Sequence, residues 1–298
     1  MSCIFTRLGA CLAAVFAAAI VLSPAAARAE PERSYQPLGQ VLAMNKVDLV
    51  RKLDSELGRY RTELGPEQTA VKADKMQEFF KRTASIYETL EDFERAEASY
   101  DALVGVQPDS PTVYTERGYF YMRQHRFKDA MRDFMRGLDL APSQSDFHYA
   151  VGRALSRMGD HAAAIPRFTE AIRLAPRDSV ALVARAEAYV QAGQYAEARA
   201  DYDRAIALGL HREGDPFFVY FGRGYADIRL ADYEAAVRDM TAAQSMRPEL
   251  IHPVVWRGYA REQMGRRELA LADYESALRT SPNDEWIRAS ITRVRSRR

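Results

Sequence analysis

The chain has 298 residues, and its 42 Lys and Arg residues are nearly balanced by 41 Asp and Glu residues, which gives a formal net charge of +1. Nucleic-acid binding requires a field of positive charge that this balance does not provide, so we predict no nucleic-acid partner. The two cysteines, Cys3 and Cys11, both lie near the N-terminus.

Residues 1–29 are typical of a secretory signal peptide. Arg7 precedes an uncharged apolar run from Leu8 to Leu22, and Ala27-Arg28-Ala29 has the small-x-small pattern of a cleavage site. The run is shorter than the ~20 residues that a membrane-spanning helix needs. We therefore predict an exported, periplasmic protein cleaved near Ala29, with membrane contact that is at most peripheral; the alternative is anchoring in the membrane by residues 8–27. Cleavage removes both cysteines, which excludes disulfides and thiolate metal sites from the mature chain.

Residues 30–76 are predicted to form a linker and a helical segment. The apolar residues between Leu38 and Leu64 include five that are spaced alternately three and four apart, as in a helical seam: Val50, Leu53, Leu57, Tyr60 and Leu64. Gly65-Pro66 is expected to end that helix. The segment is interpreted as a cover for the open end of the following array, or alternatively as a dimerisation helix.

Residues 77–284 repeat one pattern six times. An alanine recurs at intervals of 34, 34, 34, 38 and 34 residues: Ala96, Ala130, Ala164, Ala198, Ala236 and Ala270. A large residue follows each alanine by four positions: Tyr100, Phe134, Phe168, Tyr202, Met240 and Tyr274. A small residue precedes each alanine by twelve: Ala84, Gly118, Gly152, Ala186, Gly224 and Gly258. A fixed period that keeps several residue types in phase indicates stacked repeats, each with a first helix (helix A), a turn and a second helix (helix B).

The pattern resembles the tetratricopeptide repeat, which has a 34-residue period and the same succession of Gly, Tyr, Ala, Phe and Pro. The resemblance implies an all-α fold, an α-solenoid of stacked helix-turn-helix units that forms a right-handed superhelix. The expected units are 77–110, 111–144, 145–178, 179–212, 217–250 and 251–284, followed by a C-terminal capping helix over 285–298. The family's Trp near the start of helix A is replaced in every unit, by Phe80, Tyr114, His148, Leu182, Tyr220 and Val254.

Two irregularities interrupt the array. Pro166 falls inside the expected helix B of unit 145–178, where it removes a backbone hydrogen bond, so we expect a kink or a helix that starts late. Between units 179–212 and 217–250 there is a four-residue insertion, where residues 210–216 replace the tight connector; it is either a used loop or a tolerated lengthening.

Residues 285–298 are expected to cap the array. Ile287, Ile291 and Val294 share one helix face, and the arginines that follow suit the end of a helix: Arg293, Arg295, Arg297 and Arg298. The alternative is that these arginines contact an anionic surface weakly.

The sequence shows no catalytic constellation. The five histidines have neither His-x3-His nor His-Glu-x2-His spacing, and Gly222-Arg223-Gly224 belongs to an expected helix A with no strand before it. We therefore predict no enzyme activity, no metal site and no cofactor.

The resemblance further implies that helix A lines a concave face. The residues that helical spacing places on this face, or directly beside it, are Lys81, Ser85, Thr115, Tyr119, Arg123, Tyr149, Arg153, Arg157, Phe221, Tyr225 and Tyr259. Tyr and Arg carry much of the binding energy at protein interfaces, although several of these rings would alternatively pack against the next unit. Lys81 matches the family's clamp for a C-terminal carboxylate, but Ser85 and Tyr119 stand where Asn is expected, which argues against recognition of a chaperone tail.

Together these features predict a non-catalytic protein–protein interaction scaffold that binds a peptide or a partner's helix in the concave groove, within a bacterial envelope assembly. The alternatives are a self-assembling structural protein, or an undetected small-ligand carrier or enzyme.

Overall fold

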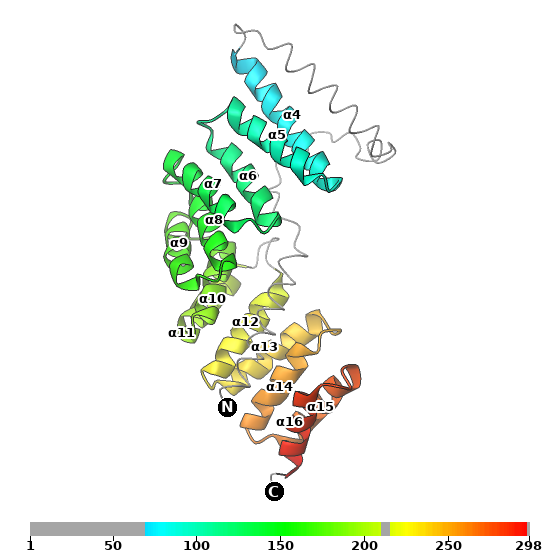
Figure 1. The fold of residues 1–298 in the computed structure, drawn as a ribbon. Helices are drawn as coiled ribbons and strands as arrows, with labels where there is room; N and C mark the ends of the chain where they lie inside the picture. The colour runs from blue at the N-terminus through cyan, green and yellow to red at the C-terminus, as the bar shows by residue number, and fades with distance from the viewer. Residues whose placement is uncertain (1–68, 210–214, 297–298) are drawn as a thin grey trace. The chain divides into compact units, whose positions relative to one another are not determined.

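The computed structural model describes residues 69–209 and 215–296, which form 13 α-helices without a strand in those ranges (Figure 1). The all-α helical repeat fold is therefore confirmed. The predicted signal peptide, the helical segment within 38–64 and most of the insertion lie outside the described residues. The helices are α4 Thr69–Thr89, α5 Phe93–Val106, α6 Pro111–Arg123, α7 Phe127–Leu140, α8 Ser145–Arg157, α9 His161–Leu174, α10 Ser179–Gln191, α11 Tyr195–Ala207, α12 Pro216–Arg229, α13 Tyr233–Met246, α14 His252–Gln263, α15 Arg267–Thr280 and α16 Glu285–Ser296.

The described helices form two compact units. One contains α4–α8 and ends at Met158; the other begins at Gly159 and contains α9–α16. Each unit has buried clusters of its own, so each is organised around its own core.

The turn between helix A and helix B has the same backbone form in all six repeats. One residue per turn has a positive φ: Glu91, His125, Gly159, Gly193, Ala231 and Gly265. Such a residue ends a helix because it lets the chain reverse out of the last turn. Helix B then starts beside an aspartate in three of the repeats, where the side chains of Asp92, Asp160 and Asp232 accept a hydrogen bond from a backbone N–H three residues on.

Pro166 lies inside α9 but does not delay the helix. Asp160 caps the first turn through the Ala163 N–H at 3.0 Å, and α9 begins at His161. The expectation of a late start is therefore wrong, because the cap precedes the proline by six residues. The other expectation, a kink at Pro166, stays a prediction.

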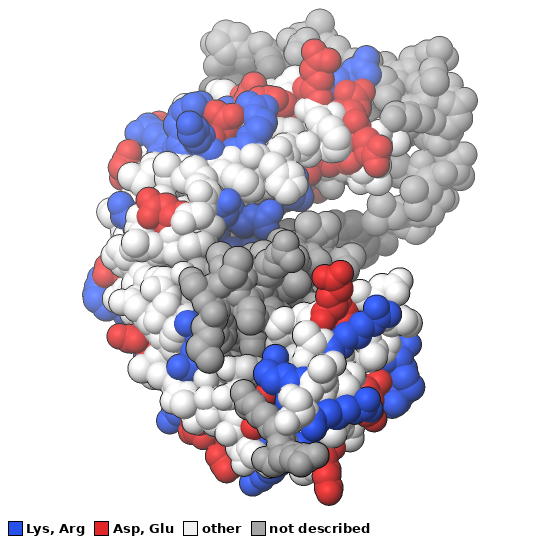
Figure 2. Space-filling model, turned by 60° about the horizontal axis from the view of Figure 1, so that its bottom comes forward, with Lys and Arg blue, Asp and Glu red and all other residues white. Residues whose placement is uncertain are grey.

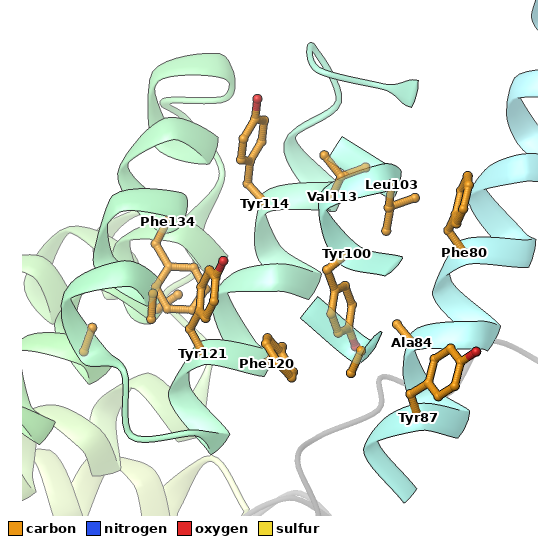
Figure 3. Close-up of a cluster of buried hydrophobic side chains, with 14 of the residues drawn as sticks. Phe80, Ala84, Tyr87, Tyr100, Leu103, Val113, Tyr114, Phe120, Tyr121 and Phe134 are labelled. Carbon is orange, nitrogen blue, oxygen red and sulfur yellow. The ribbon is translucent and has the colours of Figure 1, made fainter. Parts of the chain in front are cut away.

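In the unit α4–α8, the core forms where small residues bring neighbouring helices together. Figure 3 shows Phe80, Ala84 and Tyr87 of α4 facing Tyr100 and Leu103 of α5. Gly118 lies so close to the Phe134 ring that an added Cβ would sit 2.4 Å from it. The ring of Phe134 is fully buried, and Tyr100 and Phe120 pack with their ring centroids 5.1 Å apart.

In the unit α9–α16, the same contact recurs at Gly258, whose added Cβ would meet the Tyr274 ring at 3.0 Å. The last helix, α16, buries Ile287, Ile291 and Val294. Three positions of α16 are equivalent to positions at which each preceding helix A faces its own helix B. In α16 these positions hold exposed polar residues: Arg288, Thr292 and Arg295. A polar outer face is what a capping helix of a repeat array requires, and the capping role of residues 285–298 stays a prediction. Among the helices that the structure describes, none is long and apolar enough to cross a membrane.

We predict that Ala231→Gly stabilises the protein by about 0.5–1 kcal/mol, because Ala231 has φ 62°, a region that costs a residue with a Cβ about 1–2 kcal/mol. Gly193→Ala is the matched control: φ is 77° there and an added Cβ has open space around it. This substitution should therefore lower stability by a similar amount. The midpoint of urea unfolding measures both changes, and a decrease for Ala231→Gly would contradict the explanation.

Candidate partner-binding surface

A bidentate Arg–Asp ion pair, which the sequence analysis missed, joins helix A to helix B in four repeats. The pairs are Arg117–Asp133, Arg185–Asp201, Arg223–Asp239 and Arg257–Asp273, each with its shortest N–O distance at 2.7 Å. All four aspartates are at most 5% exposed. The pKa values of Arg117, Arg185 and Arg223 are raised, first of all by the hydrogen bonds to these carboxylates. An alignment of the six repeats on their recurring alanine would have revealed the pairs, because Arg and Asp recur 16 residues apart in four of them.

Each of these arginines also reaches the helix B of the preceding repeat. Arg117 donates to Asp101 at 2.8 Å, Arg185 to Thr169 at 3.0 Å, Arg223 to Asp203 at 2.7 Å and Arg257 to Thr241 at 3.3 Å. The guanidinium therefore links three helices. These cations therefore hold the helices of the fold together.

In the unit α4–α8, several predicted binding residues are bound to other parts of the same unit. Lys81 pairs with Glu116 at 2.5 Å. Arg123 donates two hydrogen bonds to Glu88, which also accepts one from the Tyr100 hydroxyl at 2.7 Å. Tyr119 is partly buried, and its ring meets the Phe134 ring at 5.2 Å. Two more predicted residues lie on α4 and α6: Ser85 is exposed and Thr115 is partly buried.

Three predicted residues follow one another along α8 at intervals of four: Tyr149, Arg153 and Arg157. Arg153 donates to the Tyr149 hydroxyl at 2.7 Å. Arg157 lies over the Phe127 ring at 5.4 Å, and its pKa is lowered by burial and by the neighbouring charge of Arg153. The structure thus brings Arg153 and Arg157 together, both partly buried and both touching aromatic rings.

In the unit α9–α16, two predicted residues belong to the core. Phe221 is 1% exposed and stacks on Phe217 at 5.7 Å, while Tyr225 is 4% exposed and meets Trp256 at 5.2 Å. Their rings therefore offer a partner almost no accessible area in this structure. Tyr259 is partly buried, with its ring 5.9 Å from that of Trp256.

Around Tyr225 and Tyr259 lie three residues that the sequence analysis did not select: Tyr195, Arg229 and Tyr233. Arg229 is exposed, lies over the Tyr195 ring at 4.4 Å and donates to the Tyr225 hydroxyl at 3.2 Å. The pKa of Tyr259 is raised overall, first of all by burial and then by the nearby Tyr233 and Glu262. The charges of Arg293 and Arg229 offset part of this increase. We call Tyr195, Arg229, Tyr233 and Tyr259 the tyrosine–arginine surface. A sequence signal that could have found Tyr195 and Tyr233 is the aromatic residue at the first position of helix B, which four repeats share: Phe93, Phe127, Tyr195 and Tyr233.

The helix that carries Arg229, α12, also buries a carboxyl group. Asp227 is 2% exposed, and burial together with the charge of Asp239 raises its pKa to about 6. Arg199 approaches it at 3.4 Å, which offsets only part of this effect. The ionised form of Asp227 is therefore costly in the folded protein.

The described residues contain no group of three or more His, Cys, Asp or Glu side chains that could hold a metal ion. Positive and negative side chains are interspersed among uncharged ones in the view of Figure 2. The polar side chains described above are therefore arranged in ion pairs and ring contacts.

We predict that Asp227→Asn stabilises the protein at pH 8 by about 1–3 kcal/mol, because each pKa unit corresponds to about 1.4 kcal/mol. The folded pKa lies above the ordinary value, so the folded state holds the proton more tightly than the unfolded state does. The penalty of the wild type develops as the pH rises from about 4 to about 6 and is complete above that range. Denaturant unfolding at pH 8 and pH 4 should thus show a gain that shrinks towards pH 4. A gain that is equal at both pH values would exclude titration of Asp227 as its cause.

Comparisons with known proteins agree with this architecture. Two family models, both described as tetratricopeptide repeat, match residues 82–145, 149–211 and 254–284, together just over half of the chain. The human Tetratricopeptide repeat protein 16 is 22% identical over 202 residues, which cover 63% of this chain and 23% of that protein. DnaJ homolog subfamily C member 3 from Gallus gallus is 21% identical over 239 residues, which cover 75% of this chain and 46% of that protein. The chain thus spans less than half the length of either relative.

Among solved structures, PilW, a widely conserved type IV pilus biogenesis factor, superposes with a TM-score of 0.59 at 17% identity. The superposition covers 74% of this chain and 98% of PilW. At this identity the likeness is one of fold.

Proposed function

This chain belongs to the tetratricopeptide repeat family, and we propose that it is a scaffold without catalytic activity that binds a peptide or a helix of another protein on its helix-A face. Tetratricopeptide repeat proteins are generally protein-interaction scaffolds. The proposal goes further, because it assigns the binding to a particular surface and the protein to a bacterial envelope assembly.

The tyrosine–arginine surface is the observation that carries the proposal. Its exposed Arg229 is held over the Tyr195 ring and bonded to the Tyr225 hydroxyl, so the guanidinium is oriented before a partner arrives. Side chains that are already ordered lose little entropy on binding, and Tyr and Arg are the residue types enriched among energetically dominant contacts. Tyr259 extends this surface onto α14.

The envelope location rests on residues 1–29, whose pattern is that of a secretory signal. We propose cleavage near Ala29 and a periplasmic mature chain; retention of residues 8–27 as an anchor is the alternative. The structural likeness to PilW, a pilus biogenesis factor, is compatible with an envelope assembly but is a likeness of fold alone.

We predict that Arg229→Ala together with Tyr259→Ala weakens partner binding about 30-fold, because truncation of a dominant contact costs about 2 kcal/mol. The partner is first captured from an envelope extract with residues 30–298 as bait, and its affinity is then measured by calorimetry. The matched control is Met246→Ala with Leu269→Ala, which removes two side chains that are 44% and 47% exposed on helices B. This control should leave the affinity unchanged.

Two outcomes would count against the proposal. Equal binding by the wild type and the Arg229/Tyr259 variant, with both folded by circular dichroism, would show that the partner uses another surface. Capture of further copies of this chain alone would favour the self-assembling alternative.

A further inference from the structure

Asp227 of α12 is buried as deeply as the four bridging aspartates, but it is paired less well. Each bridging aspartate accepts two hydrogen bonds from one guanidinium, with a shortest distance of 2.7 Å. In the part of the chain that the structure describes, the Asp227 side chain accepts one hydrogen bond, from Nη1 of Arg199 at 3.4 Å. A buried carboxylate is costly unless it is fully paired, so this acid is poised between its charged and neutral forms by its contacts.

The other repeats do not use an acid at this position. In phase with Asp227 they hold Tyr87, Tyr121, Leu155, Tyr189 and Arg261. The packing of a repeat therefore does not require a carboxyl group there. The contacts of Asp227 indicate its role better than the repeat pattern does.

The guanidinium of Arg199 connects three helices. Arg199 lies on α11, and its Nη1 approaches Asp227 of α12 at 3.4 Å and Asp232 at 3.3 Å. Asp232 in turn caps α13, because it accepts a hydrogen bond from the Ala235 N–H at 3.2 Å. We call Arg199, Asp227 and Asp232 the Arg199 node.

The same three helices carry the tyrosine–arginine surface. Tyr195 lies one turn before Arg199 on α11, so both side chains are on one face of that helix. The Tyr195 ring contacts the guanidinium of Arg229, which follows Asp227 by two residues on α12. The helix that the node caps, α13, begins with Tyr233. A shift of α11 against α12 therefore changes the contact on which the orientation of Arg229 depends.

We propose that Arg199 is the positioning residue of the tyrosine–arginine surface, and that protonation of Asp227 releases it. The ionised Asp227 holds the guanidinium between α12 and the start of α13. The neutral acid leaves Asp232 as the charged partner of Arg199 within the node. The surface thus has two arrangements that pH selects, and the inference rests on the proposed function only where it concerns partner binding.

The surroundings of Asp227 support a titration close to neutral pH. Burial, the charge of Asp239 on α13 and that of Asp232 raise its pKa, while Arg199 on α11 and Arg223 on α12 lower it, and the result is about 6. The folded pKa lies above the ordinary value, so the folded protein takes up this proton at a higher pH than the unfolded chain does. At pH 5, about one Asp227 in ten is ionised.

An NMR titration of the full chain between pH 8 and pH 4.5 tests the positioning without a partner. The Nε–H signal of Arg229 should shift together with the carboxyl signal of Asp227, with one midpoint near pH 6. Asp227→Asn should remove this shift and leave the Arg229 signal near its low-pH position throughout. Asp203→Asn is the matched control: Asp203 is an exposed residue of α11 that pairs with Arg223, so the shift should remain.

Arg199→Gln separates the positioning from the titration itself. Because Arg199 lowers the pKa of Asp227, its removal should move the titration of the carboxyl signal to higher pH. The Arg229 signal should then no longer follow that titration. The proposal is overturned by an Arg229 signal that does not follow Asp227 in the wild type, or that still follows it in Arg199→Gln.

Partner binding is measured separately, with the protein captured by the full chain. When only the arrangement with ionised Asp227 binds, the affinity should fall about tenfold from pH 7.5 to pH 5. Asp227→Asn should show the weaker affinity at both pH values. An Arg229 signal that titrates while the affinity stays constant would support the role of Arg199 and count against this surface as the partner's site, so the two proposals fail separately.

Discussion

The close contact between a small residue of helix A and a large side chain of helix B is the constraint on which each repeat depends. At Gly118 an added Cβ would lie 2.4 Å from the Phe134 ring, so no larger residue fits without moving the helices apart. The same approach lets Arg117 span from helix A to Asp133 on helix B with two hydrogen bonds. A buried carboxylate is costly unless it is paired in this way, so in this repeat the close packing and the ion pair support each other.

The sequence alone was sufficient to predict the helix pairs, because the residues that determine each pair lie within one repeat. The small residue, the large residue four positions after the alanine, and the turn residue keep their order in every repeat. The binding surface could not be predicted in the same way. Helical spacing places Tyr225 on the helix-A face, but the burial of its ring depends on Trp256 of the next repeat. Spacing within one helix carries no information about what its neighbour covers.

Ion pairing explains why the surface is defined by rings more than by charge. Lys81 and Arg123 are neutralised by Glu116 and Glu88, and the four bridging arginines by buried aspartates. The exposed Arg229 lies over the Tyr195 ring and donates a hydrogen bond to the Tyr225 hydroxyl, so two aromatic residues orient its guanidinium.

The distribution of the Arg–Asp pairs also determines where a perturbation can spread. In a stacked array each repeat contacts only its neighbours, so a perturbation reaches a distant repeat only through the repeats between them. The tyrosine–arginine surface lies entirely on α11–α14, and the three repeats that contribute these helices all carry the pair. Each helix that carries the surface is therefore joined to the other helix of its repeat by a bidentate ion pair.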